Sequence, residues 1–109
     1  GILGRMALAD DLATRDQWIA DGKGVAAATV ISVAGSAPRP AGARLLLSSS
    51  GEVVGSVSSG CVEGDVTARA EAVLGGGEAS IVTYGISDDQ AFEVGLSCGG
   101  TIRVLIERW

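Results

Sequence analysis

Two cysteines and one arginine are the residues whose types and spacing suit chemistry. Each lies in its own glycine-rich stretch: Arg39 in Gly35–Gly42, Cys61 in Gly55–Gly64 and Cys98 in Gly95–Gly100. A thiolate binds soft metal or sulfur centres, and a guanidinium binds phosphate. If the three stretches meet, they predict a site for a ligand that carries both a phosphate and a soft centre.

The residues after Cys61 follow the period of a helix. Its apolar stripe consists of Val62, Val66, Ala70, Val73 and Leu74. This pattern predicts that Cys61 lies in the first turn of the helix, where unpaired N–H groups lower a thiol pKa. Glu63 in the same turn opposes that effect.

Each of these residues also has a plain structural interpretation. Cys61 and Cys98 are small enough to be packed thiols in tight glycine turns. Arg39, held between two prolines, suits a solvated loop tip. Glu63 suits a carboxylate that caps a helix. The residues alone leave both interpretations open.

Composition excludes several classes of protein. The chain of 109 residues has no histidine and only two cysteines. This rules out Ser-His-Asp and Cys-His catalysis and zinc sites that contain histidine, and it argues against a disulfide scaffold. Eight basic residues against 13 acidic ones give a net charge of −5, which argues against nucleic-acid binding.

Hydropathy and local charge add to these limits. No apolar run reaches the length of a membrane span, and no secretory signal is recognisable, so we expect a cytoplasmic protein. Between Gly24 and Val62 the charged residues are Arg39, Arg44 and Glu52, a small positive excess that favours an anionic ligand.

The expected elements define an α/β chain. An amphipathic helix is predicted over Ala7–Asp21, with Leu8, Leu12 and Ile19 on one face, and a short helical turn through Asp88–Phe92. A serine turn, Ser48–Gly51, predicts a hairpin. The predicted strands are Val25–Val33, Arg44–Leu47, Glu52–Val57, Ala79–Ile86 and Thr101–Glu107.

These elements predict one domain over residues 1–109, an α/β sandwich with a mixed sheet of about five strands and two main helices. Residues 1–5, which precede Met6, fit an expression remnant and carry no weight. We find no G-x-G-x-x-G unit after a strand, and therefore expect no Rossmann-like domain.

Four motifs make the chain resemble the N-terminal domain of the XdhC/CoxI family. The resemblance runs from about Gly24 to the end of the chain. The motifs are Gly35-Ser36-Ala37-Pro38-Arg39-Pro40 with Gly42, Ser59-Gly60-Cys61-Val62-Glu63-Gly64, Tyr84-Gly85, and Gly95-Leu96-Ser97-Cys98-Gly99-Gly100.

The resemblance implies a non-enzymatic accessory factor. Such proteins bind the molybdenum–molybdopterin cofactor transiently and protect its sulfurated form. They help insert it into the apo-enzyme of a molybdenum hydroxylase, of the xanthine dehydrogenase or carbon monoxide dehydrogenase type, together with a cysteine desulfurase. The cofactor contacts implied here are Arg39, Ser59, Gly60, Cys61, Glu63, Cys98 and Gly99, with the two thiols facing molybdenum or sulfur.

Two other functions are compatible with the residues. The first is a structural or regulatory subunit whose glycine loops build an interface, with a homodimer among the expected assemblies. The second is a thiol redox protein that cycles a Cys61–Cys98 disulfide, although no C-x-x-C pair is present.

Overall fold

The chain forms two helices and five strands in the part that the computed structural model describes, residues 2–35, 39–58, 62–85 and 100–109. The elements are α1 (Ile2–Ala20), β1 (Val25–Ala34), β2 (Arg44–Ser48), β3 (Val53–Gly55), α2 (Glu63–Leu74), β4 (Ser80–Tyr84) and β5 (Thr101–Arg108). The predicted α/β class, with five strands and two main helices, is confirmed.

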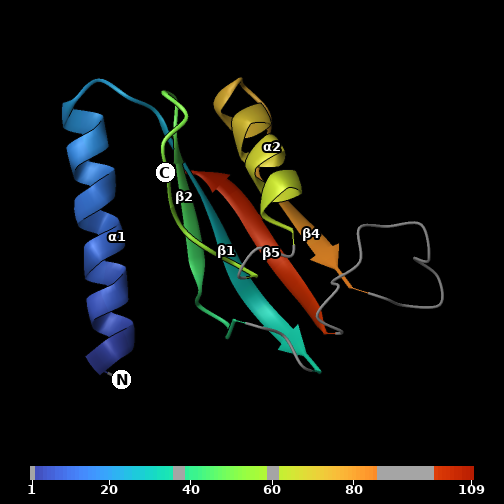
Figure 1. Cartoon of the computed structure of the whole chain (residues 1–109). Helices are drawn as coiled ribbons and strands as arrows, with labels where there is room; N and C mark the ends of the chain where they lie inside the picture. The colour runs from blue at the N-terminus through green and yellow to red at the C-terminus, as the bar shows by residue number, and fades with distance from the viewer. Residues whose placement is uncertain (1, 36–38, 59–61, 86–99) are drawn as a thin grey trace.

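The sheet has the strand order β3-β2-β1-β5-β4, and every neighbouring pair is antiparallel. The predicted mixed sheet is therefore wrong. The crossover from β3 through α2 to β4 does join two strands that run in the same direction. However, β2, β1 and β5 lie between them, so these parallel strands never pair (Figure 1).

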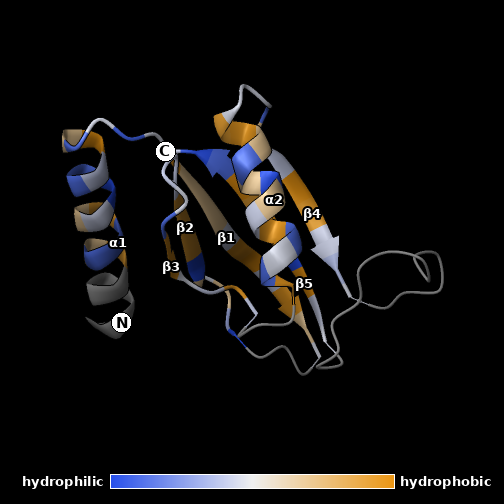
Figure 2. Ribbon diagram, turned by 45° about the horizontal axis from the view of Figure 1, so that its top comes forward, coloured by the Kyte–Doolittle hydropathy of each residue, from blue (hydrophilic) through white to orange (hydrophobic). Residues whose placement is uncertain are grey.

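The central strand β1 is covered on both faces, because its residues alternate between two apolar clusters. Ala26, Ala28 and Val30 pack on the α2 side, with residues of β2 and β5. Val25 and Ala27 pack on the other side against Trp18 of α1. Figure 2 shows the apolar residues of these central strands between the two helices.

Helix α2 packs on the sheet through the predicted stripe. Val66 and Ala70 are fully buried, Val62 and Val73 are nearly so, and Leu74 packs at the edge of the cluster. The helix begins at Glu63, with Val62 as its N-cap. The predicted position of Cys61 in the first turn of this helix lies outside the described residues.

Helix α1 packs through a different face from the predicted one. Of the three residues expected to be covered, Leu8 and Ile19 are 43% and 51% exposed, whereas Leu12 is half-buried. The helix instead contacts the sheet through a stripe offset by part of a turn. This stripe consists of Asp11, Arg15 and Trp18, at the helical spacing i, i+4 and i+7.

The remaining boundaries differ in detail. The third strand is shorter than predicted, because it pairs only over Val53–Gly55. The serine turn does form a hairpin, with Gly51 at a φ of +90° and its N–H bonded to the Ser48 carbonyl. The helical turn predicted at Asp88–Phe92 lies outside the described residues. No helix in the described ranges is long and apolar enough to span a membrane.

Candidate functional site

The predicted site residues divide into two groups. Arg39 and Glu63 lie in the described part of the chain. Ser59, Gly60, Cys61, Cys98 and Gly99 lie outside it, so their assignment stays a prediction. The described residues that lead into and out of these loops nevertheless show where each loop is anchored.

The loop anchors lie at one end of the sheet. Ala34, which ends β1 before the Arg39 stretch, pairs with Thr101, which begins β5 after the Cys98 stretch. Tyr84, which ends β4, pairs with Ile102 of β5. Antiparallel pairing thus brings these three strand ends side by side (Figure 1).

Glu63 ties the residues before Cys61 to the first turn of α2. Its Oε2 accepts hydrogen bonds from the Val57 N–H at 2.8 Å and the Ser58 N–H at 3.0 Å. The hydroxyls of Ser56 and Ser58 also donate to this carboxylate. The predicted cofactor contact of Glu63 stays a prediction, but four donors of the preceding turn already hold its oxygens.

Ser58 bonds to Val62, the residue that follows the short segment 59–61. Its side chain is fully buried, and its Oγ accepts a hydrogen bond from the Val62 N–H at 2.9 Å. The Ser58 hydroxyl therefore adds a second link, besides Glu63, between the chain on either side of residues 59–61. Because that hydroxyl also donates to Glu63, the two contacts form one connected network.

Gly55 is required where the chain leaves β3 and approaches this network. Its φ is +84°, and a Cβ there would lie 2.2 Å from the carbonyl oxygen of Arg44. A side chain at this position would push β3 away from β2. The glycine therefore lets residues 56–58 turn directly toward Glu63.

Asp65 bonds the first turn of α2 to β4, as Glu63 bonds it to residues 56–58. The Tyr84 hydroxyl donates to Asp65 Oδ2 at 2.5 Å, and Arg69 Nε donates to the same oxygen at 2.7 Å. Burial raises the pKa of Asp65, but the bonds from Tyr84 and Arg69 outweigh it, so the net pKa lies below its usual value. Burial and the neighbouring Asp65 raise the pKa of Tyr84 well above its usual value.

Gly85 joins the two ends of the segment that carries Cys98. It has a φ of +152°, and a Cβ there would lie 2.8 Å from Thr101 Cα and 2.4 Å from Thr101 Oγ1. Only glycine permits this close approach. The exit of β4 therefore packs directly on the entrance of β5.

Arg39 and Arg44, the two arginines between Gly24 and Val62, lie in different surroundings. Arg39 is exposed, and among the described residues no ion pair involves it. Arg44 is bonded to Asp11 at 2.9 Å and lies over the Trp109 ring at 4.9 Å. Arg44 thus serves the packing of α1.

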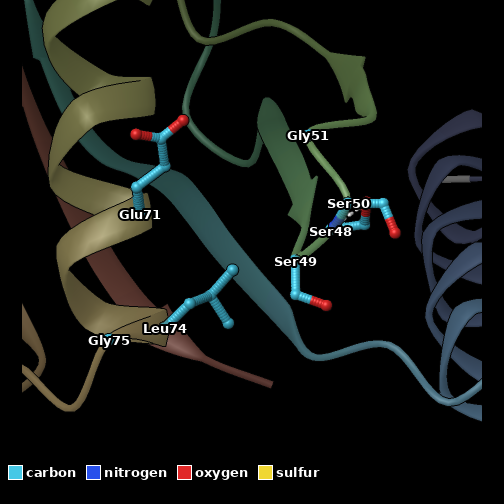
Figure 3. Close-up of a pocket in the computed structure, with 7 residues that line it drawn as sticks. All are labelled: Ser48, Ser49, Ser50, Gly51, Glu71, Leu74 and Gly75. Carbon is cyan, nitrogen blue, oxygen red and sulfur yellow. Dashed lines mark hydrogen bonds between the residues drawn. The ribbon is translucent and has the colours of Figure 1, made fainter.

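A cleft of about 430 Å³ lies at the other end of the sheet, between the serine hairpin and the last turn of α2. Figure 3 shows Glu71 and Leu74 of α2 beside the turn that contains Ser49. None of the predicted site residues lines it. The loop anchors therefore locate the candidate site better than this cleft does.

Comparison with known proteins identifies the family. The sequence pattern of the XdhC and CoxI family matches residues 18–85. The chain belongs to this family. A relative from Bacillus subtilis, described as a probable xanthine dehydrogenase subunit, is 36% identical over 95 residues, which cover 85% of this chain and 29% of that protein.

Two further members of this group of relatives are similar to the chain. The molybdenum cofactor insertion chaperone PaoD of Escherichia coli is 33% identical over 87 residues, which cover 80% of this chain and 27% of PaoD. A crystal structure of a xanthine dehydrogenase from Bacillus halodurans matches with a TM-score of 0.71 and 35% identity, over 90% of this chain and 30% of that one. The chain thus spans less than a third of each relative.

The sequence motifs of the XdhC/CoxI family indicate few of the residues that support the site. Tyr84 belongs to one motif, but no pattern assigns a role to Ser56, Ser58 or Asp65. Tyr84 carries a usable signal, since a buried tyrosine needs a partner for its hydroxyl. Nothing in the spacing of Ser58 and Glu63 indicates that they bond across the turn.

Proposed function

We propose that this chain is the cofactor-binding part of an accessory factor that delivers the molybdenum–molybdopterin cofactor to a molybdenum hydroxylase. The observation that carries the proposal is the match to the XdhC and CoxI family over residues 18–85, together with the similarity to a molybdenum cofactor insertion chaperone. In this role the protein binds and hands over the cofactor and does not catalyse turnover.

The donor types of the candidate site fit this cofactor. We propose that Arg39 holds its phosphate, since this residue is exposed, follows the end of β1 in the chain and among the described residues has no ion-pair partner. Cys61 and Cys98 are the proposed contacts to molybdenum or sulfur, because thiolates suit soft centres. Ser59, Gly60 and Gly99 are the proposed backbone contacts.

Glu63 acts in this proposal through the turn that precedes Cys61. Its carboxylate gathers the N–H groups of Val57 and Ser58. With those donors satisfied, the backbone of Val57 and Ser58 is held in place in the absence of cofactor. Such preorganisation lowers the entropy cost of binding.

The finer features belong to the same proposal. We propose that the factor protects the sulfurated cofactor, receives sulfur through a cysteine desulfurase, and works in the cytoplasm. Its target is an apo-enzyme of the xanthine dehydrogenase or carbon monoxide dehydrogenase type. A homodimer is the assembly we propose to test first.

Molybdenum retention tests the cofactor assignment. Purified protein is mixed with molybdenum cofactor, desalted, and assayed for bound molybdenum. The wild type should retain the metal, the Cys61→Ala, Cys98→Ala double variant should lose most of it, and Arg39→Gln should bind more weakly. Arg15→Gln, which removes an arginine on α1, is the matched control. Equal retention by all four proteins would contradict the assignment.

The alternative is an interaction subunit of the enzyme itself, which the description of the Bacillus subtilis relative favours. The two functions differ in how partner binding depends on cofactor. A delivery factor should bind apo-hydroxylase more tightly when loaded and release it after transfer. A permanent subunit should co-purify with the hydroxylase whether or not cofactor is present.

A further inference from the structure

Tyr84 has a position that packing alone does not explain. It is the last residue of β4, it is 1% exposed, and it belongs to the apolar cluster under α2. Its ring fills space that phenylalanine would fill equally well. Its hydroxyl, however, reaches the half-buried edge of the cluster and donates to Asp65 at 2.5 Å.

Asp65 is held from two sides. Tyr84 and Arg69 donate to the same carboxylate oxygen, at 2.5 Å and 2.7 Å. Arg69 lies one turn further along α2, so the helix itself orients the acceptor. The Tyr84 hydroxyl therefore bonds to a group whose position is already determined.

Asp65 is also only two residues from Glu63, which holds Val57 and Ser58. One turn of α2 thus carries two carboxylates with separate tasks. Glu63 holds the residues that precede Cys61, and Asp65 holds the residue that precedes Gly85 and the segment with Cys98. Both anchors are thus bonded to the same turn of α2.

We propose that Tyr84 is a positioning residue whose hydroxyl, bonded to Asp65, sets the separation between the anchors of the two cysteine loops. The consequence for cofactor affinity rests on the function proposed above. The positional claim does not, because it concerns contacts within this chain.

The test uses the fact that Cys61 and Cys98 are the two cysteines of the sequence. Nitroxide labels on both thiols report the distribution of distances between them. Tyr84→Phe keeps the ring and removes the hydroxyl, so we expect a broader distribution than in the wild type. Asp65→Asn, in which Tyr84 is unchanged, keeps an oxygen that accepts the Tyr84 bond and should retain most of the wild-type width.

Val73→Ala is the matched control. It removes buried methyl groups from the last turn of α2, far from both anchors, and should destabilise the protein without changing the distance distribution. A wild-type distribution in Tyr84→Phe would overturn the proposal. Equal broadening in Val73→Ala would also overturn it, because general loosening would then explain the effect.

Cofactor binding is measured separately on unlabelled protein. Tyr84→Phe should weaken molybdenum binding about tenfold, because loops whose separation is no longer fixed must be ordered when the cofactor binds, with Val73→Ala at the wild-type value. If the wild type binds no molybdenum while Tyr84→Phe still broadens the distances, the proposed function fails and the positioning role stands. If binding occurs and the distances do not change, the positioning role fails alone.

Discussion

The two helices attach to the same sheet in different ways. Helix α2 buries a continuous apolar stripe, and the carboxylates of its first turn bond to the segments that flank the cysteine loops. Helix α1 buries Trp18 and makes one half-buried ion pair, while Trp109 lies against the guanidinium groups of Arg15 and Arg44.

The two helices therefore have different roles: α2 holds the segments that flank the cysteine loops, and α1 only covers one face of the sheet. Polar side chains on α2 are used to hold loop segments, whereas polar side chains on α1 hold the helix itself. Changes to the two carboxylates in the first turn of α2, Glu63 and Asp65, should therefore affect stability and cofactor binding together. Changes on α1 should affect stability alone.

Removing the Glu63 carboxylate should have the largest effect. Glu63→Ala leaves the Val57 N–H and the Ser58 hydroxyl without their Glu63 acceptor and the Ser58 N–H with the Ser56 hydroxyl alone, which costs about 3 kcal/mol of unfolding free energy. Urea denaturation measures this loss. Glu71→Ala, an exposed glutamate on the same helix, should change stability by less than about 0.5 kcal/mol. A similar effect of both variants would show that the Glu63 contacts contribute little.

Truncating the α2 stripe should come next. Val66→Ala removes two methyl groups from a fully buried position and should cost about 2 kcal/mol. Leu8→Ala on α1 removes a side chain that is 43% exposed, and its cost should stay below about 0.5 kcal/mol. Thermal or urea unfolding of the two variants compares the helices directly. Equal costs would contradict the described packing of α1.

The ion pair of α1 should have a moderate effect confined to stability. Asp11→Asn leaves Arg44 with a weaker partner at side chains that are 18% and 14% exposed, so we expect a loss of about 1 kcal/mol. Molybdenum binding should equal that of the wild type. A lower affinity for molybdenum in this variant would show that α1 also affects cofactor binding, and the two helices would then not differ in this respect.

The smallest effect should come from the titration of Asp65. Because its pKa is lower in the folded protein than the ordinary 3.8, it stabilises the fold above that value, and this contribution is lost as the pH falls through the folded pKa. The wild type should therefore lose about 0.5 kcal/mol more than Asp65→Asn below about pH 4. Parallel stability curves from pH 6 to pH 3 would contradict the assigned role of Asp65.

The apolar patterns predict the helices and strands because an element that buries one of its sides carries apolar residues at a regular spacing. The stripe from Val62 to Leu74 and the apolar run from Val25 identify α2 and the central strand correctly. The order of the strands in the sheet, in contrast, produces no regular pattern in the sequence. Nothing in the sequence says that β5 inserts between β1 and β4, and so the purely antiparallel pairing does not follow from it.

The polar contacts of the site are the least predictable part. The sequence places Glu63 in the first helical turn, but its bonds to Val57 and Ser58 depend on how the chain leaves Gly55. The buried face of α1 is mispredicted for a related reason. Leu8 and Ile19 form an apolar stripe, yet Trp18 and the Asp11–Arg44 pair determine how the helix packs.

Protection of the two thiols by bound cofactor tests the central claim most directly. Cys61 and Cys98 are alkylated in the presence of increasing molybdenum cofactor, and the modification of each is followed by mass spectrometry. If the loops form one site, both thiols should become protected with the same midpoint concentration. Protection of one thiol alone, or of neither while molybdenum binds, would contradict a shared site.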